Sequence, residues 1–181
     1  FEKGIDFIAI NTDSQDLECC DVKNKIHIGK NLTRGLGAGM NPDLGKQAAE
    51  ETRAEIIESI KGADLVFITA GLGGGTGTGA SPVIAEMAKE AGALTIAVIT
   101  KPFSFEGAQR GRIADEGLQK LREKVDTMIV IPNDRIFSVI DKDTPLIKAF
   151  EIVDEILRYA VQGIADLIAM PGIVNVDFAD V

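Results

Sequence analysis

Six glycines lie within the nine residues Gly71–Gly79, interrupted only by one leucine and two threonines. The segment follows the apolar run Leu65–Ala70 and precedes a helical pattern. A strand that passes through a glycine-rich turn into a helix lets backbone N–H groups converge on an anion, with the helix dipole behind them. Thr76 and Thr78 would add hydroxyl donors. Because so many glycines cost too much chain entropy for a mere connection, the segment predicts a phosphate-binding loop.

The loop alone does not define which phosphate ligand it holds. A Walker A loop is excluded, because no GxxxxGK[ST] pattern occurs in the chain. Gly75, Gly77 and Ala80 fit the G-x-G-x-x-A fingerprint of dinucleotide-binding folds. Such folds have an acidic residue after the next strand that binds a ribose hydroxyl, and this chain has Lys101 near that position instead. An NADP-dependent oxidoreductase, with Lys101 in place of that acidic residue, therefore stays open as an alternative.

Short β-rich runs alternate with longer helical patterns along the chain, which predicts a single α/β domain with a Rossmann-like parallel sheet and flanking helices. The expected strands are Ile5–Ile10, Ile26–Ile28, Leu65–Thr69, Leu94–Ile99 and Thr127–Ile131. The expected helices are Pro42–Ile60, Ser81–Glu90, Gly107–Glu123 and a long one, Thr144–Ala169. Pro42 and Pro82 are expected in first helical turns. Gly62 and Gly92 are expected to end the helices before them.

The composition is that of a globular domain, with 45% hydrophobic and 26% charged residues. A formal net charge of −9 argues against a nucleic-acid partner, which would need a basic patch. No apolar run reaches the roughly 18 residues of a membrane span, so we expect no direct membrane insertion. Cys19 and Cys20 are adjacent, and neighbouring cysteines rarely bridge, so we expect reduced thiols in a cytosolic protein.

Residues 73–79, Gly-Gly-Gly-Thr-Gly-Thr-Gly, resemble the signature of the tubulin/FtsZ family. Further segments resemble that family in the same order, namely residues 11–13, 33–39, 100–107, 131–134 and 175–180. The resemblance covers essentially the whole chain. The form Lys101-Pro102-Phe103, followed by Phe105-Glu106-Gly107, resembles bacterial members rather than archaeal ones or eukaryotic tubulin.

This resemblance implies a cytoplasmic GTPase that polymerises head to tail and forms the division ring at mid-cell. GTP and GDP would be its ligands, with Mg²⁺ expected for charge neutralisation. Its partners would be further copies of itself, together with division-ring proteins that bind regions outside this chain. A filament protein of the same family with a role other than division is the alternative.

The resemblance also implies a set of nucleotide-binding residues. Those near the phosphates and ribose would be Asn11, Ala38, Gly39, Met40, Gly74, Gly75, Thr76, Gly77, Thr78, Glu106 and Arg110, and those at the base would be Asn133, Phe150 and Asp154. Asp13 would lie at the metal edge of the site. Ala38–Met40 would present backbone amides to the γ-phosphate, and Glu106 would accept the ribose hydroxyls.

Two of these pairs also have a plain structural interpretation. Glu106 and Arg110 are four residues apart at the start of a helix, so a surface ion pair is the alternative to ribose and phosphate contacts. Phe150 and Asp154 share one face of the long helix and could stack on guanine and accept from its edge. The alternative places Phe150 in the core and pairs Asp154 with Arg158.

Asn175, Asp177 and Asp180 follow the long helix. By the resemblance, this loop projects into the nucleotide pocket of the next subunit and polarises the attacking water, so hydrolysis would require polymerisation. Roughly 25 helical residues at about 1.5 Å each would separate the base contacts from this loop. The alternative is that Asp177 and Asp180 have only a structural role.

The resemblance further implies that residues 1–181 form a partial GTP-binding domain. The family's first strand and helix, a first glycine-rich loop and a second, C-terminal domain would all lie outside the chain. The absent strand would fall between the strands at Ile5–Ile10 and Leu65–Thr69 and leave unpaired edges there. We therefore expect the isolated chain to be poorly stable and to bind GTP weakly.

Overall fold

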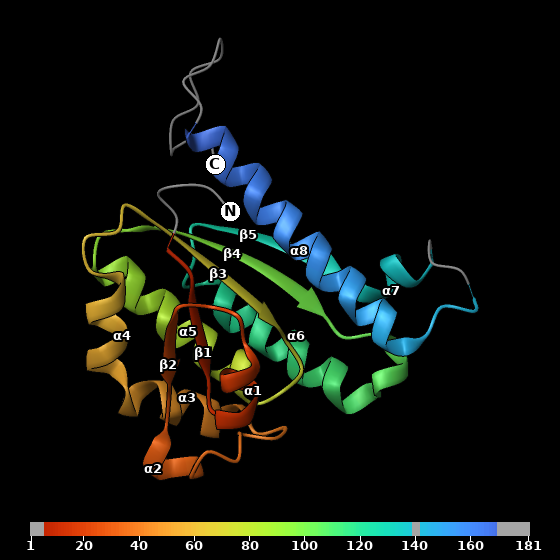
Figure 1. The fold of residues 1–181 in the computed structure, drawn as a ribbon, viewed down its shortest axis with the longest axis horizontal. Helices are drawn as coiled ribbons and strands as arrows, with labels where there is room; N and C mark the ends of the chain where they lie inside the picture. Colours follow the sequence, from red (N-terminus) through yellow and green to blue (C-terminus); the bar gives the residue numbers. More distant parts are fainter. Residues whose placement is uncertain (1–5, 139–141, 170–181) are drawn as a thin grey trace.

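Parallel strands covered by helices make up the structure, a computed structural model that describes residues 6–138 and 142–169 (Figure 1). The strands are β1 (Ile8–Asn11), β2 (Asn24–His27), β3 (Leu65–Gly71), β4 (Leu94–Lys101) and β5 (Thr127–Pro132). The helices are α1 (Ser14–Cys19), α2 (Lys30–Thr33), α3 (Pro42–Glu51), α4 (Arg53–Ile60), α5 (Thr76–Glu90), α6 (Ala108–Arg122), α7 (Asn133–Phe137) and α8 (Leu146–Ala169), with a 3₁₀ turn, η1 (Ser104–Glu106).

The strands form two separate parallel sheets. β1 pairs with β2 in one sheet, and β3, β4 and β5 pair in that order in the other. Among the described residues, β1 and β3 therefore each have a single strand partner. The division falls between the strands where the sequence predicted unpaired edges.

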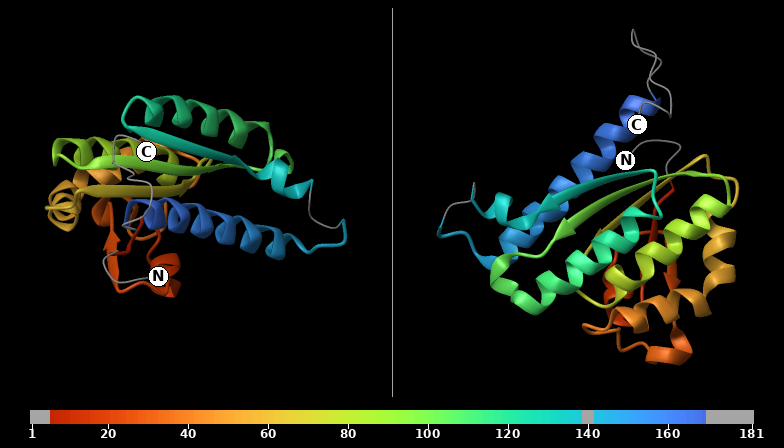
Figure 2. Two further views of the ribbon diagram at one scale, coloured as in Figure 1. Left: turned by 90° about the horizontal axis from the view of Figure 1, so that it is seen from above. Right: turned by 180° about the vertical axis from the view of Figure 1, so that it is seen from behind.

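Helices cover both faces of the three-stranded sheet (Figure 2). In the central strand β4, Ile96 and Val98 pack against Val161 and its neighbours on α8. The alternate residues Ala97 and Ile99 pack on the other face, in a cluster that includes residues of α5 and α6. Burial on both faces explains why residues 96–99 of β4 are all apolar rather than alternating with polar residues.

The two-stranded sheet shares its core with α3, α4 and α5. Ile26 and Ile28 pack against Ala48 of α3 and Ile56 of α4, and all four side chains are buried. Apolar residues of α5 complete the same cluster. This common core fixes β1 and β2 beside the larger sheet, although no strand pairing joins the two sheets in the part of the chain that the structure describes.

Glycines allow α3 and α5 to pack at backbone distance. A Cβ built at Gly45 of α3 would collide with the carbonyl oxygen of Gly75, and one at Gly79 of α5 would collide with that of Pro42. A Cβ at Gly77 would lie 2.8 Å from Gly71 O of β3. Several glycines of the 71–79 segment are thus required by helix packing, a reason that the sequence interpretation did not include.

The predicted helix Pro42–Ile60 is wrong in one respect, because two helices divide at Thr52. The Thr52 hydroxyl donates to Ala48 O at 3.2 Å and accepts from the N–H of Gly29 at 3.0 Å. Its backbone departs from helical geometry, with φ −103° and ψ 19°. The contact to Gly29 lies far away in sequence, which is why the local pattern gave no sign of the break.

The predicted start of the next helix is also wrong. Helix α5 begins at Thr76, inside the glycine-rich segment, so Pro82 lies within the helix rather than in its first turn. Pro42 does lie in the first turn of α3, as predicted. Gly62 and Gly92 adopt positive φ, 80° and 83°, after α4 and α5, which confirms them as stop signals.

Strands β3 and β4 extend beyond their predicted ends because their pairing continues further. β3 pairs with β4 as far as Gly71 opposite Thr100, and β4 pairs with β5 as far as Lys101 opposite Pro132. The short helices α1, α2 and α7 were not predicted. No helix in residues 6–138 and 142–169 is long and apolar enough to cross a membrane.

We predict that Gly79→Ala destabilises the protein by about 1–3 kcal/mol, because the new methyl group meets backbone atoms of α3 that cannot move away. Gly163→Ala is the matched control, since that helical position opens into free space and the substitution should stabilise by roughly 0.5–1 kcal/mol. Urea unfolding measures both. Equal stability of the two variants would contradict the close packing of α3 and α5.

Candidate nucleotide-binding site

The glycine-rich segment is held in shape by hydrogen bonds to its own residues and to a neighbouring loop. Gly73, at φ 114°, donates its N–H to Thr78 Oγ1 at 2.9 Å. Gly75 donates its N–H to Gly39 O at 2.7 Å. Leu72 N–H is bonded to Thr100 O at 3.0 Å, which continues the pairing of β3 with β4. These bonds fix the backbone on either side of the helix start.

Four other backbone N–H groups of the segment have no hydrogen-bond acceptor within the described part of the chain, those of Gly74, Thr76, Gly77 and Thr78. Three of them are the first N–H groups of α5, where the positive end of the helix dipole lies. A row of unpaired donors at this position is suited to phosphate oxygens. The structure therefore presents backbone donors where the sequence predicted an anion cradle.

The threonine hydroxyls have other contacts. Thr76 Oγ1 lies 2.6 Å from Thr12 Oγ1, which follows β1 and is fully buried. Thr78 is also buried, and its hydroxyl oxygen accepts from Gly73 as described. Both hydroxyls therefore help to shape the loop and join it to β1. The Thr78 hydroxyl hydrogen is not used in its bond to Gly73, and the expected role of these hydroxyls as anion donors stays a prediction. The backbone N–H groups of both threonines remain available.

Residues 38–41 lie directly against the glycine-rich segment. The carbonyl oxygen of Gly39 accepts from Gly75, and Ala38 is buried. Met40 is 36% exposed, so its larger side chain points outward without displacing the backbone contact. Asn41 caps α3 by accepting from the N–H groups of Asp43 and Leu44. The structure thus brings Ala38, Gly39 and Met40 to the predicted phosphate loop.

Asn11 and Asp13, at the end of β1, make local hydrogen bonds. Asn11 Oδ1 accepts from Thr12 N–H at 2.8 Å and from Asp13 N–H at 3.2 Å. Asp13 Oδ1 caps α1 by accepting from Gln15 and Asp16. In the described ranges, no three His, Cys, Asp or Glu residues gather as a metal site. Phosphate contact by Asn11 and metal contact by Asp13 stay predictions.

Glu106 and Arg110 do not form the surface ion pair that was the alternative to a binding role, judging from the ion pairs of the described region. Glu106 Oε2 instead accepts from Phe103 N–H at 2.7 Å. Arg110 lies beside the glycine loop, since a Cβ at Gly73 would be 3.2 Å from Arg110 O. Arg110 is therefore close to the glycine loop, and one carboxylate oxygen of Glu106 is used in a hydrogen bond within the η1 turn.

The predicted base contacts lie on α7 and α8, which pack against each other. Phe150 meets Phe103 edge to face, with ring centroids 5.5 Å apart, and is 39% exposed, so part of its ring is open. Asn133 is 5% exposed, and its Oδ1 has no hydrogen-bond partner, the one such buried side-chain atom found in residues 6–138 and 142–169. A buried unpaired acceptor is costly unless a ligand satisfies it.

Asp154 lies one turn beyond Phe150 and is exposed. Partial burial raises the pKa of its carboxyl, Arg158 opposes that shift, and Glu151 adds to it. No direct ion pair joins Asp154 and Arg158 among those of the described chain. The carboxylate is therefore available to a ligand edge beside Phe150.

The three predicted catalytic residues, Asn175, Asp177 and Asp180, lie outside the described residues. Three contacting residues were missed by the sequence analysis: Thr12, which bonds Thr76, and the pair Ser104 and Asp134, which join η1 to α7. Each contact links segments far apart in sequence, so no local pattern could have revealed it.

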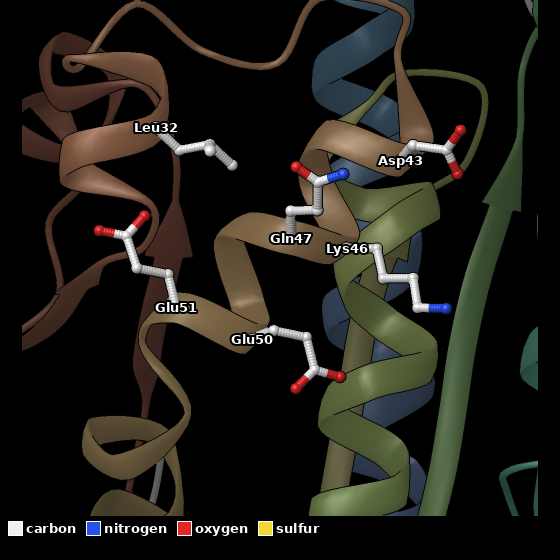
Figure 3. A pocket seen from close by; sticks show the side chains of 6 residues that line it. All are labelled: Leu32, Asp43, Lys46, Gln47, Glu50 and Glu51. Carbon is white, nitrogen blue, oxygen red and sulfur yellow. The ribbon is translucent and has the colours of Figure 1, made fainter.

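A surface depression is lined by residues of α2 and α3 (Figure 3). None of its lining residues was predicted to bind nucleotide. They are Leu32, Asp43, Lys46, Gln47, Glu50 and Glu51.

The parallel sheet and the glycine loop that opens α5 with unpaired backbone donors are the arrangement of an α/β nucleotide-binding domain. The model of the tubulin/FtsZ family GTPase domain matches residues 1–141. The chain belongs to the tubulin/FtsZ family.

Solved structures agree with this assignment. An empty FtsZ dimer from M. jannaschii is 53% identical, with a TM-score of 0.89, over 96% of this chain and 50% of that one. A W319Y mutant of FtsZ from M. jannaschii is 52% identical, with a TM-score of 0.90, over 97% and 52%. The GTPγS-bound protofilament of CetZ2 from Haloferax volcanii is 26% identical, with a TM-score of 0.80, over 89% and 49%.

The chain thus spans about half the length of the solved structures it matches. None of these three is described as bacterial, so the bacterial form inferred from residues 101–107 stays a prediction.

We predict that Thr78→Val weakens nucleotide binding and lowers stability by about 1–3 kcal/mol, because it leaves the Gly73 N–H buried without an acceptor. Thr78→Ser keeps the oxygen and should retain most of the affinity. Calorimetric titration with GDP compares the two variants. Equal affinities for valine and serine would show that this hydrogen bond does not shape the loop.

Proposed function

We propose that this chain is the GTPase domain of a longer protein that hydrolyses GTP and assembles head to tail into filaments. The observation that carries the proposal is the row of unpaired N–H groups at Gly74 and Thr76–Thr78, backed by the dipole of α5. Several adjacent N–H donors at the positive end of a helix dipole suit the oxygens of a chain of phosphates. The family assignment and the dimer and protofilament titles of the relatives support self-assembly.

In this proposal the base is read at the other end of the site. Guanine carries N–H donors at N1 and N2, which need acceptors. The unpaired Oδ1 of Asn133 and the carboxylate of Asp154 provide them, and the open part of Phe150 stacks on the ring. Glu106 receives the ribose hydroxyls between base and phosphates, and Arg110 lies at the phosphate side.

The residues at the end of β1 fit a magnesium ion that is held mainly by phosphates. Mg²⁺ usually takes one or two carboxylates and completes its shell with water and phosphate oxygens. Asp13 has one carboxylate oxygen occupied by the α1 cap and Oδ2 facing Gly37. Asp13 would hold the ion, and the ion would neutralise charge on the phosphates.

Hydrolysis is water attack on the γ-phosphate, and the chain contributes to it chiefly by positioning. Asn175, Asp177 and Asp180 would enter the pocket of the next subunit and orient the water there. Neither half-site works alone, so turnover would follow polymerisation. This arrangement requires the base contacts and the catalytic loop to lie near opposite ends of α8, a helix of 24 residues.

A cytoplasmic filament at the division ring is the proposed biological role. The similarity to CetZ2 favours a second candidate, a filament of the same family with a role other than division. Depletion and localisation in cells separate the two, because both would bind GTP. The oxidoreductase alternative has no support, since Lys101 is ion-paired with Asp115 at 2.8 Å and the chain belongs to a GTPase family.

We predict that Asp154→Asn lowers GTP affinity by about tenfold to a hundredfold and raises affinity for xanthosine triphosphate. Xanthine replaces the N2 amine by a carbonyl, which an asparagine amide can meet as a donor. In the parent protein, GTP affinity should fall as the pH drops through the raised pKa of Asp154, since only the carboxylate accepts two donors. Unchanged base preference in the variant would remove Asp154 from the base site.

We predict that Asp180→Ala in the full-length protein keeps GTP binding and polymer formation while turnover falls by orders of magnitude. The reason is that the lost carboxylate would act only in a neighbour's pocket. GTPase rate and sedimentation are followed together. Loss of GTP binding instead would show that this loop serves its own subunit's nucleotide.

A further inference from the structure

The segments that directly follow β4 and β5, called here the exits of these strands, lie side by side where the proposed function places the guanine base. The two strands are parallel and in register to their last residues, Lys101 opposite Pro132. The chain then turns into η1 after β4 and into α7 after β5. Residues expected to touch the nucleotide, Glu106 and Asn133, lie on these two exits.

One side chain joins the exits. Asp134 accepts from Ser104 N–H at 2.8 Å through Oδ1 and from the Ser104 hydroxyl through Oδ2. Both bonds lower the pKa of the Asp134 carboxyl, and the nearby Lys101 lowers it further. The carboxylate is thus ionised at neutral pH and makes two charge-assisted hydrogen bonds to a single residue.

The η1 segment, to which Asp134 is hydrogen-bonded through Ser104, is also anchored by the side chain of Phe103. That side chain is buried in a cluster with Ile136, Ala149 and Val153, between α7 and α8. Glu106 Oε2 accepts from Phe103 N–H at 2.7 Å, so the orientation of Glu106 depends on the same backbone. A shift of η1 would therefore move the ribose contact as well.

Within residues 6–138 and 142–169, the Asn133 side chain makes no hydrogen bond of its own. Its Oδ1 is buried and unpaired, and Pro132 provides no side-chain cap for α7. The placement of Asn133 depends on the backbone at the start of α7. The next residue, Asp134, supplies the hydrogen bonds that tie that backbone to η1, beside the packing of Phe103 on Ile136.

We propose that Asp134 is a positioning residue for base recognition: by holding Ser104 with both carboxylate oxygens, it fixes Asn133 and Glu106 relative to each other. This inference rests on the proposed function, which assigns guanine to Asn133. Asp134 touches no nucleotide in this account. It acts through the geometry of the two exits.

The test compares GTP with inosine triphosphate, which lacks the 2-amino group, in the full-length protein. Selectivity is the KM for inosine triphosphate divided by that for GTP. Asp134→Ala and Ser104→Ala should each raise the KM for GTP, the former by about tenfold, with a smaller rise for inosine triphosphate. The selectivity then falls while kcat changes little, and Ser104→Thr, which keeps the hydroxyl, restores it.

Asp126→Ala is the matched control. The Asp126 carboxylate, just before β5, also accepts from a backbone N–H of the neighbouring strand, that of Thr95 in β4, but at the opposite end of the sheet. It should lower stability without moving selectivity. If Asp134→Ala does not fold, Ser104→Ala decides the question, since the Ser104 N–H bond to Asp134 remains in that variant.

Asn133→Ala separates failure of this inference from failure of the base site. If it retains the parent selectivity, Asn133 does not read the base, and the role of Asp134 falls with it. If Asn133→Ala loses selectivity while Asp134→Ala and Ser104→Ala keep it, the base site stands and the positioning role of Asp134 is overturned.

Discussion

The close approach of α3 to α5 is the constraint on which the rest of the site depends. Glycines at 45 and 79 allow the two helix backbones to touch, and no larger residue would fit at either position. This contact carries the 38–41 loop against the glycine-rich segment, where Gly39 O takes up the Gly75 N–H. The neighbouring N–H groups of Gly74 and of residues 76–78 have no acceptor in the described part of the chain. Helix packing thus holds in place the loop that carries the open donors.

In the proposed function, the two ends of the site use different chemistry. Phosphates would meet backbone donors, which are fixed in place by the fold and need no side-chain ordering on binding. The base would meet the side chains of Asn133, Phe150 and Asp154, which lie on α7 and α8 rather than on the glycine loop. Thr12 joins the phosphate end to β1 through Thr76, so even the smaller sheet contributes to loop geometry.

Much of this architecture could be predicted from the sequence. Apolar runs and glycine stops located all five strands and α8 to within a few residues, because buried parallel strands and long amphipathic helices leave strong periodic signals. The break at Thr52, the early start of α5 and the Ser104–Asp134 contact could not be predicted, since each depends on a partner distant in sequence. The glycine pattern predicted a turn between a strand and a helix, which the structure has, but not the packing role of Gly79.

Amide chemical shifts test the central claim most directly. Isotope-labelled full-length protein is titrated with GDP, and backbone N–H resonances are followed residue by residue. The account predicts large downfield proton shifts at Gly74, Thr76, Gly77 and Thr78, which gain phosphate acceptors, and small ones at Gly73 and Gly75, which already have partners. Uniform shifts across the segment, or shifts confined to Gly73 and Gly75, would contradict it.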